Sequence, residues 1–167
     1  ALSSAASDVY KRQALDLILK EYDHVIVVSQ YDEILQYASQ RGATSILCLE
    51  SIHGLSYSIK AAVNYLNTLE KLFRMIFMVA DQPYISMNTI DKLMHTKHKL
   101  ASCAYKDKVG NPTLFDSSYI PELLLLKEDQ GGRKVLNKHP NEVEYIQVEN
   151  VRELYDIDYQ EDLKQLQ

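Results

Sequence analysis

Residues 74–83 read R-M-I-F-M-V-A-D-Q-P, and this stretch decides the predicted fold. Residues 74–80 form the most apolar strand expected in the chain, typical of a strand covered on both faces. Pro83 ends it, because proline cannot continue a central strand. Asp81 is therefore expected at the carboxyl end of a buried strand. In α/β sheets ligands bind at these ends, so the residues after each strand are the first candidates for a site.

Strand and helix patterns alternate on both sides of this stretch. Further strands are expected at 24–29, 44–49, 101–105, 113–115 and 142–149. Helices are expected at 14–22, 32–41, 56–72, 86–99, 119–126, 131–137 and 160–166. The sequence thus predicts an α/β protein with a mainly parallel sheet.

The composition is that of one globular domain. The chain has 167 residues, 46% of them hydrophobic, and a formal net charge of -5, which makes a general nucleic-acid binder a poor expectation. The longest apolar run, residues 75–80, is too short to span a bilayer, and residues 1–13 contain no secretory signal. Cys48 and Cys103 each lie in an apolar run, so we expect buried, reduced thiols and a cytoplasmic protein.

The N-terminus has an unusual sequence. Residues 3–13 read S-S-A-A-S-D-V-Y-K-R-Q, which is the translation of a widely used transposon sequencing adaptor. The alternative is a genuine polar arm, but agreement over the whole segment favours a segment foreign to the fold. The expected division is a non-native segment at 1–13 and a single domain at 14–167.

Three groups of residues could carry chemistry. Asp81 offers a carboxylate of the kind that magnesium binds together with substrate phosphates, although a turn aspartate before proline is common. Residues 54–58, G-L-S-Y-S, join a strand to a long helix, where amides can hold an anion or Ser56 can simply cap the helix. Residues 110–112 and 129–133 are glycine-containing tracts that alone read as turns. The five histidines show no metal-ligand spacing.

Five tracts, in this order, resemble the MobA-like NTP-transferase family, particularly the molybdenum cofactor cytidylyltransferases. They are G-L-S-Y-S at 54–58, V-A-D-Q-P at 79–83, G-N-P-T-L-F at 110–115, E-D-Q-G-G-R at 128–133 and D-I-D-Y-Q-E-D-L at 156–163. The last tract usually reads D-I-D-T-P-E-D-L in the family, so Tyr159 and Gln160 depart from it. The resemblance implies a Rossmann-like nucleotidyltransferase fold of the nucleotide-diphospho-sugar transferase type, with three layers.

The resemblance also implies an activity. The terminal phosphate of the molybdenum cofactor would attack the α-phosphorus of CTP and release pyrophosphate. Asp81 would be the catalytic residue and would bind Mg²⁺, with Asp158 as a second metal ligand. The expected partners are the nucleotide, a molybdopterin-type small molecule and a molybdenum hydroxylase as client, with no nucleic acid and no membrane.

Two sets of binding residues follow from the same resemblance. The nucleotide side would consist of Gly54, Leu55, Ser56, Ser58, Gln82 and Pro83. The acceptor side would consist of Gly110, Asn111, Pro112, Asp129 and Arg133.

One departure from the family bears on activity. The family opens with a strand and the loop L-A-A-G-x-S-x-R-M-G-x-x-K, whose amides, arginine and lysine hold the triphosphate, and nothing like it occurs here. We therefore expect the first strand and the phosphate loop to be missing and the chain as it stands to be nearly inactive.

The alternatives are a guanylyltransferase of the same family, a non-catalytic accessory protein that delivers the molybdenum cofactor to a hydroxylase and, more weakly, a sugar-1-phosphate nucleotidyltransferase. The genomic sequence upstream would separate the enzyme from the accessory protein.

Overall fold

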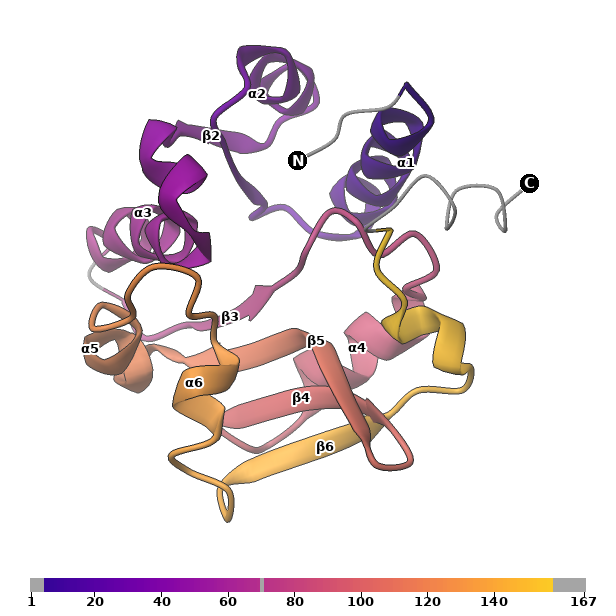
Figure 1. Ribbon diagram of the computed structural model, residues 1–167, viewed down its shortest axis with the longest axis vertical. Coiled ribbons are helices and arrows are strands. Elements are labelled where there is room, and N and C mark those ends of the chain that lie inside the picture. Colours follow the sequence, from indigo (N-terminus) through magenta and orange to yellow (C-terminus); the bar gives the residue numbers. More distant parts are fainter. Residues whose placement is uncertain (1–4, 70, 158–167) are drawn as a thin grey trace.

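The computed structural model describes residues 5–69 and 71–157, which form an α/β protein with six strands in two groups (Figure 1). The larger sheet has the order β3-β5-β4-β6, and the other two strands pair as β1-β2. In the larger sheet β3, β4 and β6 run in one direction and only β5 runs against them, so the expected mainly parallel arrangement is confirmed. The bounds are β1 (Ile26–Ser29), β2 (Thr44–Leu47), β3 (Arg74–Phe77), β4 (Leu100–Tyr105), β5 (Lys108–Asp116) and β6 (Val143–Gln147).

Helices cover both faces of the larger sheet. Because side chains alternate across a strand, successive residues of β4 and β5 enter two different apolar clusters. Leu100 and Phe115 belong to the cluster formed with α3, α5 and α6, whereas Ala101 and Leu114 belong to the cluster formed with Leu93 of α4. The helices are α1 (Ala5–Glu21), α2 (Asp32–Ser39), α3 (Leu55–Asn67), α4 (Met87–His95), α5 (Ile120–Leu123) and α6 (Arg133–Leu136), with 3-10 helices η1 (Leu49–His53), η2 (Ser117–Tyr119) and η3 (Val151–Leu154).

The β1-β2 pair is parallel and is not hydrogen-bonded to the larger sheet within the described residues. The Val25 carbonyl accepts from Thr44 of β2, and the Ser29 carbonyl accepts from Cys48 just after it. By alternation, the backbone groups of Ile26 and Val28 face the opposite edge. All four residues of β1 are only half-buried, although they are mostly β-branched. The expected single sheet is therefore divided, with β1 and β3 each carrying one edge that no described strand pairs.

Several element boundaries differ from expectation. The strand expected at 74–80 ends at Phe77, and the strand expected at 113–115 begins earlier, at Lys108. The sequence allows either Ser86 or Asn88 to cap α4, and in the structure Ser86 does so, accepting a hydrogen bond from the Thr89 amide at 3.2 Å. The helix expected at 160–166 lies outside the described residues.

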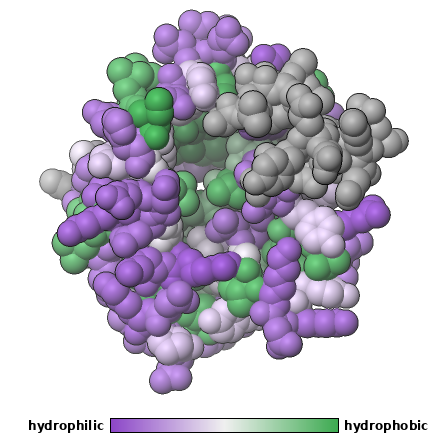
Figure 2. All heavy atoms as spheres, viewed as in Figure 1, coloured by the Kyte–Doolittle hydropathy of each residue, from purple (hydrophilic) through white to green (hydrophobic). Residues whose placement is uncertain are grey.

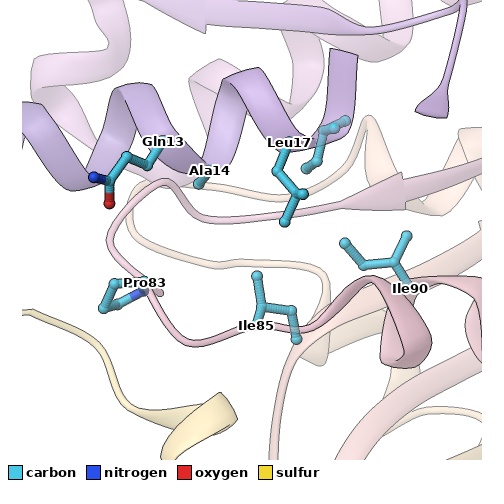
Figure 3. A pocket seen from close by; sticks show the side chains of 7 residues that line it. Gln13, Ala14, Leu17, Pro83, Ile85 and Ile90 are labelled. Atoms are coloured by element: carbon cyan, nitrogen blue, oxygen red, sulfur yellow. The ribbon is translucent and has the colours of Figure 1, made fainter. Parts of the chain in front are cut away.

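The expected division at residues 13 and 14 falls inside the continuous helix α1. Beside this helix, Gln13, Ala14 and Leu17 face Pro83 and Ile85 across a pocket of about 90 Å³ (Figure 3). A nucleotide site needs roughly 300 Å³ or more, so this pocket is not one. The foreign origin of residues 3–13 stays a prediction. Among the described helices, none has the length and apolar character needed to cross a membrane.

Phe115 provides a test of the core. Its side chain is fully buried between β3, α6 and the α3 side of the sheet. Replacing Phe115 with alanine should lower the free energy of unfolding by about 3–5 kcal/mol, because it leaves a cavity that rigid strands cannot close. Leu125→Ala, at a side chain that is 70% exposed, should change it by less than about 0.5 kcal/mol. Urea denaturation of both variants measures the difference, and equal losses would show that Phe115 is not a core anchor.

Candidate functional site

Asp81 lies in the loop that follows β3, four residues beyond the end of the strand at Phe77. The side chain is half-buried, and the Asp81 carbonyl accepts a hydrogen bond from the Ile157 amide at 2.8 Å. Gln82, the next residue, is 2% exposed, and its Oε1 has no hydrogen-bond partner among the described residues. Pro83 lines the small pocket against α1. The loop is thus held from two sides.

The start of α3 uses most of the donors that the sequence offers there. Gly54 is the N-cap, and the Ser56 amide already donates to the Glu128 carbonyl at 3.0 Å. The Ser58 hydroxyl is hydrogen-bonded to the Ser51 hydroxyl at 2.7 Å. In contrast, Ser56 Oγ is fully buried and has no partner within the described residues. A buried polar atom without a hydrogen bond lowers the free energy of unfolding by about 1–3 kcal/mol. The Ser56 hydroxyl is such an atom and does not cap the helix.

Gly54 also explains how this segment meets the tract at 128–133. Its φ of 141° is a conformation essentially restricted to glycine, and a Cβ there would lie 2.3 Å from the Glu128 carbonyl oxygen and 2.7 Å from the Asp129 amide nitrogen. A Cβ on Gly131 would lie 2.9 Å from Leu55 Cδ2. Gly54 and Gly131, which were predicted to lie against a ligand, instead allow the segment at 54–55 and the segment at 128–131 to approach each other closely.

Residues 110–112 lie in a β-bulge of β5, not in the expected turn. Ser102 pairs with Thr113 and Cys103 with Gly110, so residues 111–112 have no partner on β4. The Ser102 hydroxyl donates to the Gly110 carbonyl at 2.8 Å and stabilises the irregularity. Bulges bend a strand and redirect its side chains, and they recur next to active sites.

The tract at 128–133 reaches the same strand. Gly132 lies against the Phe115 ring, which a Cβ would approach to 2.7 Å. The Arg133 guanidinium donates to the Val109 carbonyl, a neutral partner, and the residue is exposed. Asp129 is also exposed. Arg133 thus presents a positive charge at the start of β5.

These contacts join the predicted tracts in space, one after another. Residues 54–58 contact 128–133, which contact 110–115. A Cβ on Gly110 would lie 3.3 Å from Leu154 Cδ2, and the residues after Leu154 reach Asp81 through Ile157. Asp158 lies outside the described residues. That all the predicted residues line one cleft stays a prediction.

Figure 2 shows where the surface is hollowed. In the view shared with Figure 1, the hollow lies between α3 and α1, above β3, and apolar side chains are visible inside it. In Figure 1, β1 and the chain that follows β3 run through the same part of the view.

Basic side chains that the sequence reading missed lie near the Asp81 loop. Arg152 Cζ lies 6.0 Å from the ring centroid of Tyr84, and Lys108 Nζ lies 4.9 Å from the ring centroid of Tyr155. Both tyrosines are within three residues of Asp81 or Ile157 in sequence. Each cation is separated from that loop in the chain, so sequence spacing gave no signal.

The donor set tests the predicted metal. No group of three His, Cys, Asp or Glu side chains that could hold a metal comes together in the described part of the chain. The described residues therefore do not form a metal site made of three or more protein side chains. Magnesium and similar hard cations commonly take one or two protein carboxylates, with substrate phosphates supplying other ligands. Asp81, in the loop after β3, is one such carboxylate, and its role as a metal ligand stays a prediction.

Glu153 is a third residue that the sequence analysis did not identify. It lies in η3, is 5% exposed, and its carboxylate accepts from Ser86 and Thr89 of α4. A single glutamate in the short segment V-R-E-L carries no sequence signal that its side chain is buried.

The close packing at Gly54 can be tested with a matched control. Gly54→Ala should lower the free energy of unfolding by about 3 kcal/mol or more, because backbone strain adds to a collision with a carbonyl that cannot rotate away. Gly42 also has a positive φ, 90°, but a Cβ there meets nothing within 4 Å. Gly42→Ala should therefore cost only about 1–2 kcal/mol. Denaturant unfolding distinguishes them, and a Gly54→Ala loss no larger than the control would contradict the packing argument.

Comparison with known proteins matches residues 9–143 to the MobA-like NTP transferase domain. A nucleotidyl transferase from Methanothermobacter superposes with a TM-score of 0.75 at 15% identity, covering 95% of this chain and 78% of that one. Rv0371c from Mycobacterium tuberculosis, in a complex with manganese, gives 0.74 at 19%, covering 93% and 83%. Molybdopterin-guanine dinucleotide biosynthesis protein A from Archaeoglobus fulgidus gives 0.60 at 19%, covering 90% and 82%.

At these identities the structural matches establish the fold alone. A sequence search among curated proteins gave no match. The family match spans most of the chain and includes four of the five tracts, together with Asp81 and the bulge of β5. The chain belongs to the MobA-like NTP transferase family, and its fold is that of the Rossmann-like nucleotidyltransferases.

Proposed function

We propose that this protein transfers CMP from CTP to the terminal phosphate of the molybdenum cofactor and releases pyrophosphate. The observation that carries the transfer chemistry is Asp81, a half-buried residue in the loop after β3 whose backbone carbonyl accepts a hydrogen bond from the Ile157 amide. The cytidylyl and molybdenum parts rest on the five sequence tracts. The Archaeoglobus protein, named for molybdopterin-guanine dinucleotide biosynthesis, supports an acceptor of the molybdopterin type.

The reaction needs positioning and charge neutralisation more than a covalent nucleophile. An acceptor phosphate oxygen forms a bond to the α-phosphorus of CTP, and the bond from that phosphorus to the bridging oxygen of pyrophosphate breaks. A divalent cation, when bound, supplies charge neutralisation between the phosphates. Asp81 would hold that cation, with Asp158 proposed as a second carboxylate. The manganese in the Rv0371c complex supports a divalent-cation site in this fold, and Mg²⁺ is the ion we propose.

On the nucleotide side, Ser56 Oγ and Gln82 Oε1 support the proposal because both are buried polar atoms without a hydrogen-bond partner in the described residues. Leu55, 44% exposed, offers an apolar contact at the same helix start. Gly54 and Ser58 would shape this side indirectly, through the backbone contact at Glu128 and the hydrogen bond to Ser51.

On the acceptor side, Arg133 is the leading candidate for a phosphate contact. Its guanidinium has several donors, and the hydrogen bond to Val109 does not neutralise its charge. The bulge at Asn111 and Pro112 would set the shape of this side, and Asp129 would lie at its rim.

The phosphate loop of the family has no counterpart in these 167 residues. We propose that the family's first strand and this loop belong beside the hollow. The unpaired edges of β1 and β3 support this, because a strand between them would pair both and bury the half-exposed side chains of β1.

A guanylyltransferase is the second candidate. The name of the Archaeoglobus protein favours it, whereas the tracts at 110–112 and 131–133 favour the cytidylyl branch. Pyrophosphate release by the chain that carries the family's strand and loop, measured with a molybdopterin-type acceptor and either CTP or GTP, separates the two candidates. Binding of the acceptor without release from either nucleotide would support the non-catalytic accessory protein.

Asp81→Asn tests the metal assignment. The change is nearly isosteric but removes the charge, so Mn²⁺ affinity in the presence of CTP should fall at least about tenfold, while the free energy of unfolding should change by less than about 1 kcal/mol. Asp32→Asn, at the exposed start of α2, is the matched control and should leave the affinity unchanged. Electron paramagnetic resonance of free Mn²⁺ measures both. Undiminished binding by Asp81→Asn would place the metal elsewhere.

The missing loop gives a second test. Removing a single well-placed oxyanion donor costs about 3–4 kcal/mol of transition-state stabilisation, and here several are absent together. Turnover by the 167-residue chain should therefore be nearly undetectable. A chain that carries the family's strand and loop ahead of Ala14 should release pyrophosphate from CTP when a molybdopterin-type acceptor is present to take the CMP. Full activity of the 167-residue chain would refute the role given to the loop.

A further inference from the structure

A buried carboxylate joins the C-terminal segment to the start of α4. Glu153 Oε2 accepts hydrogen bonds from Thr89 Oγ at 2.6 Å, Ser86 Oγ at 2.9 Å and the Ser86 amide at 3.1 Å. The residue is 5% exposed. Three donors directed at one oxygen form a charge-assisted cluster, which is roughly twice as strong per bond as a neutral one.

The same cluster keeps Glu153 ionised. Burial alone would raise the pKa of the carboxyl, but the hydrogen bonds from Thr89 and Ser86 outweigh it and hold the pKa of Glu153 below its usual value. A charge at this position is stable only while these donors stay in place.

Glu153 lies on a closed ring of contacts that contains Asp81. Ser86 is five residues after Asp81, and Ile157 is four residues after Glu153. The Glu153–Ser86 hydrogen bonds close one end of the two segments, and the bond from the Ile157 amide to the Asp81 carbonyl closes the other. Two short segments joined at both ends cannot shift independently. Between them, Leu154 packs against Gly110, so the ring also touches the bulge of β5.

We propose that Glu153 is a positioning residue that holds the loop at 81–86, and with it the Asp81 carboxylate, in the geometry that binds a metal–nucleotide complex. It acts through Ser86 and Thr89 without touching substrate. This inference rests on the proposed function for the metal–nucleotide ligand. The ring of contacts stands independently of that function.

The test has two readouts on the folded chain. Glu153→Ala should speed hydrogen exchange of the Ile157 amide on the order of tenfold, because the other end of the ring is released. It should also weaken Mn²⁺ binding in the presence of CTP on the order of tenfold. Glu153→Gln, which keeps an acceptor oxygen, should recover most of both effects. Thr89→Val removes one donor and should give an intermediate result if Glu153→Ala folds poorly.

Glu142→Ala is the matched control. Glu142 likewise accepts a hydrogen bond from a hydroxyl, that of Tyr119, but it precedes β6 and is not part of the ring. It should alter neither readout.

Exchange at Ile157 that is as slow in Glu153→Ala as in the control would overturn the proposal. So would faster exchange with unchanged Mn²⁺ affinity. If the chain that carries the family's strand and loop ahead of Ala14 binds no Mn²⁺ with CTP, the proposed function fails, and exchange at Ile157 alone then decides whether Glu153 holds the loop.

Discussion

The structure depends on β5, which alone among the described strands runs against its neighbours. It must bond β3 along one edge and β4 along the other while accommodating two extra residues at 111–112. Its side chains enter both apolar clusters, with Phe115 on one face and Leu114 on the other. The tract at 128–133 packs on it through Gly132 and Arg133, and η3 packs on it through Leu154. Four of the five predicted tracts therefore take their position directly or indirectly from this strand, and the fifth lies mostly outside the described residues.

Much of the architecture was predictable because its causes are local. Apolar runs such as residues 74–77 and the Ser86 cap of α4 carry signals within a few residues. The length of β5 was not predictable, because Gly110 and Pro112 are turn-forming residues. The strand continues past them only because the residues on either side of the bulge, Gly110 and Thr113, pair with β4. The division into two sheets likewise depends on which strand edges meet, and edge pairing is a long-range property that a local pattern does not contain.

For the candidate site, the sequence predicted which segments lie near one another better than it predicted which atoms their residues contact. Gly54 was expected to approach a ligand, but the structure gives it a backbone neighbour at Glu128. Capping of the helix by Ser56 was one of the two expectations for that residue, but Gly54 is the N-cap and the Ser56 hydroxyl is buried without a cap hydrogen bond. Glu153 could not be found, because its donors on α4 are more than sixty residues away in the chain. Such partners become visible only when the fold brings η3 beside α4.

The central claim is that Asp81, Gly54 and the bulge at Gly110 border one metal–nucleotide site. Paramagnetic broadening by Mn²⁺ with CTP in the NMR spectrum of the labelled chain tests it most directly, because broadening falls steeply with distance from the ion. The account predicts that the amide signals of residues 54–58, 81–84 and 110–113 broaden together and that Asp81→Asn abolishes the effect. Broadening centred elsewhere, for example at His139 and Glu142, with the signals of residues 81–84 unchanged, would contradict it.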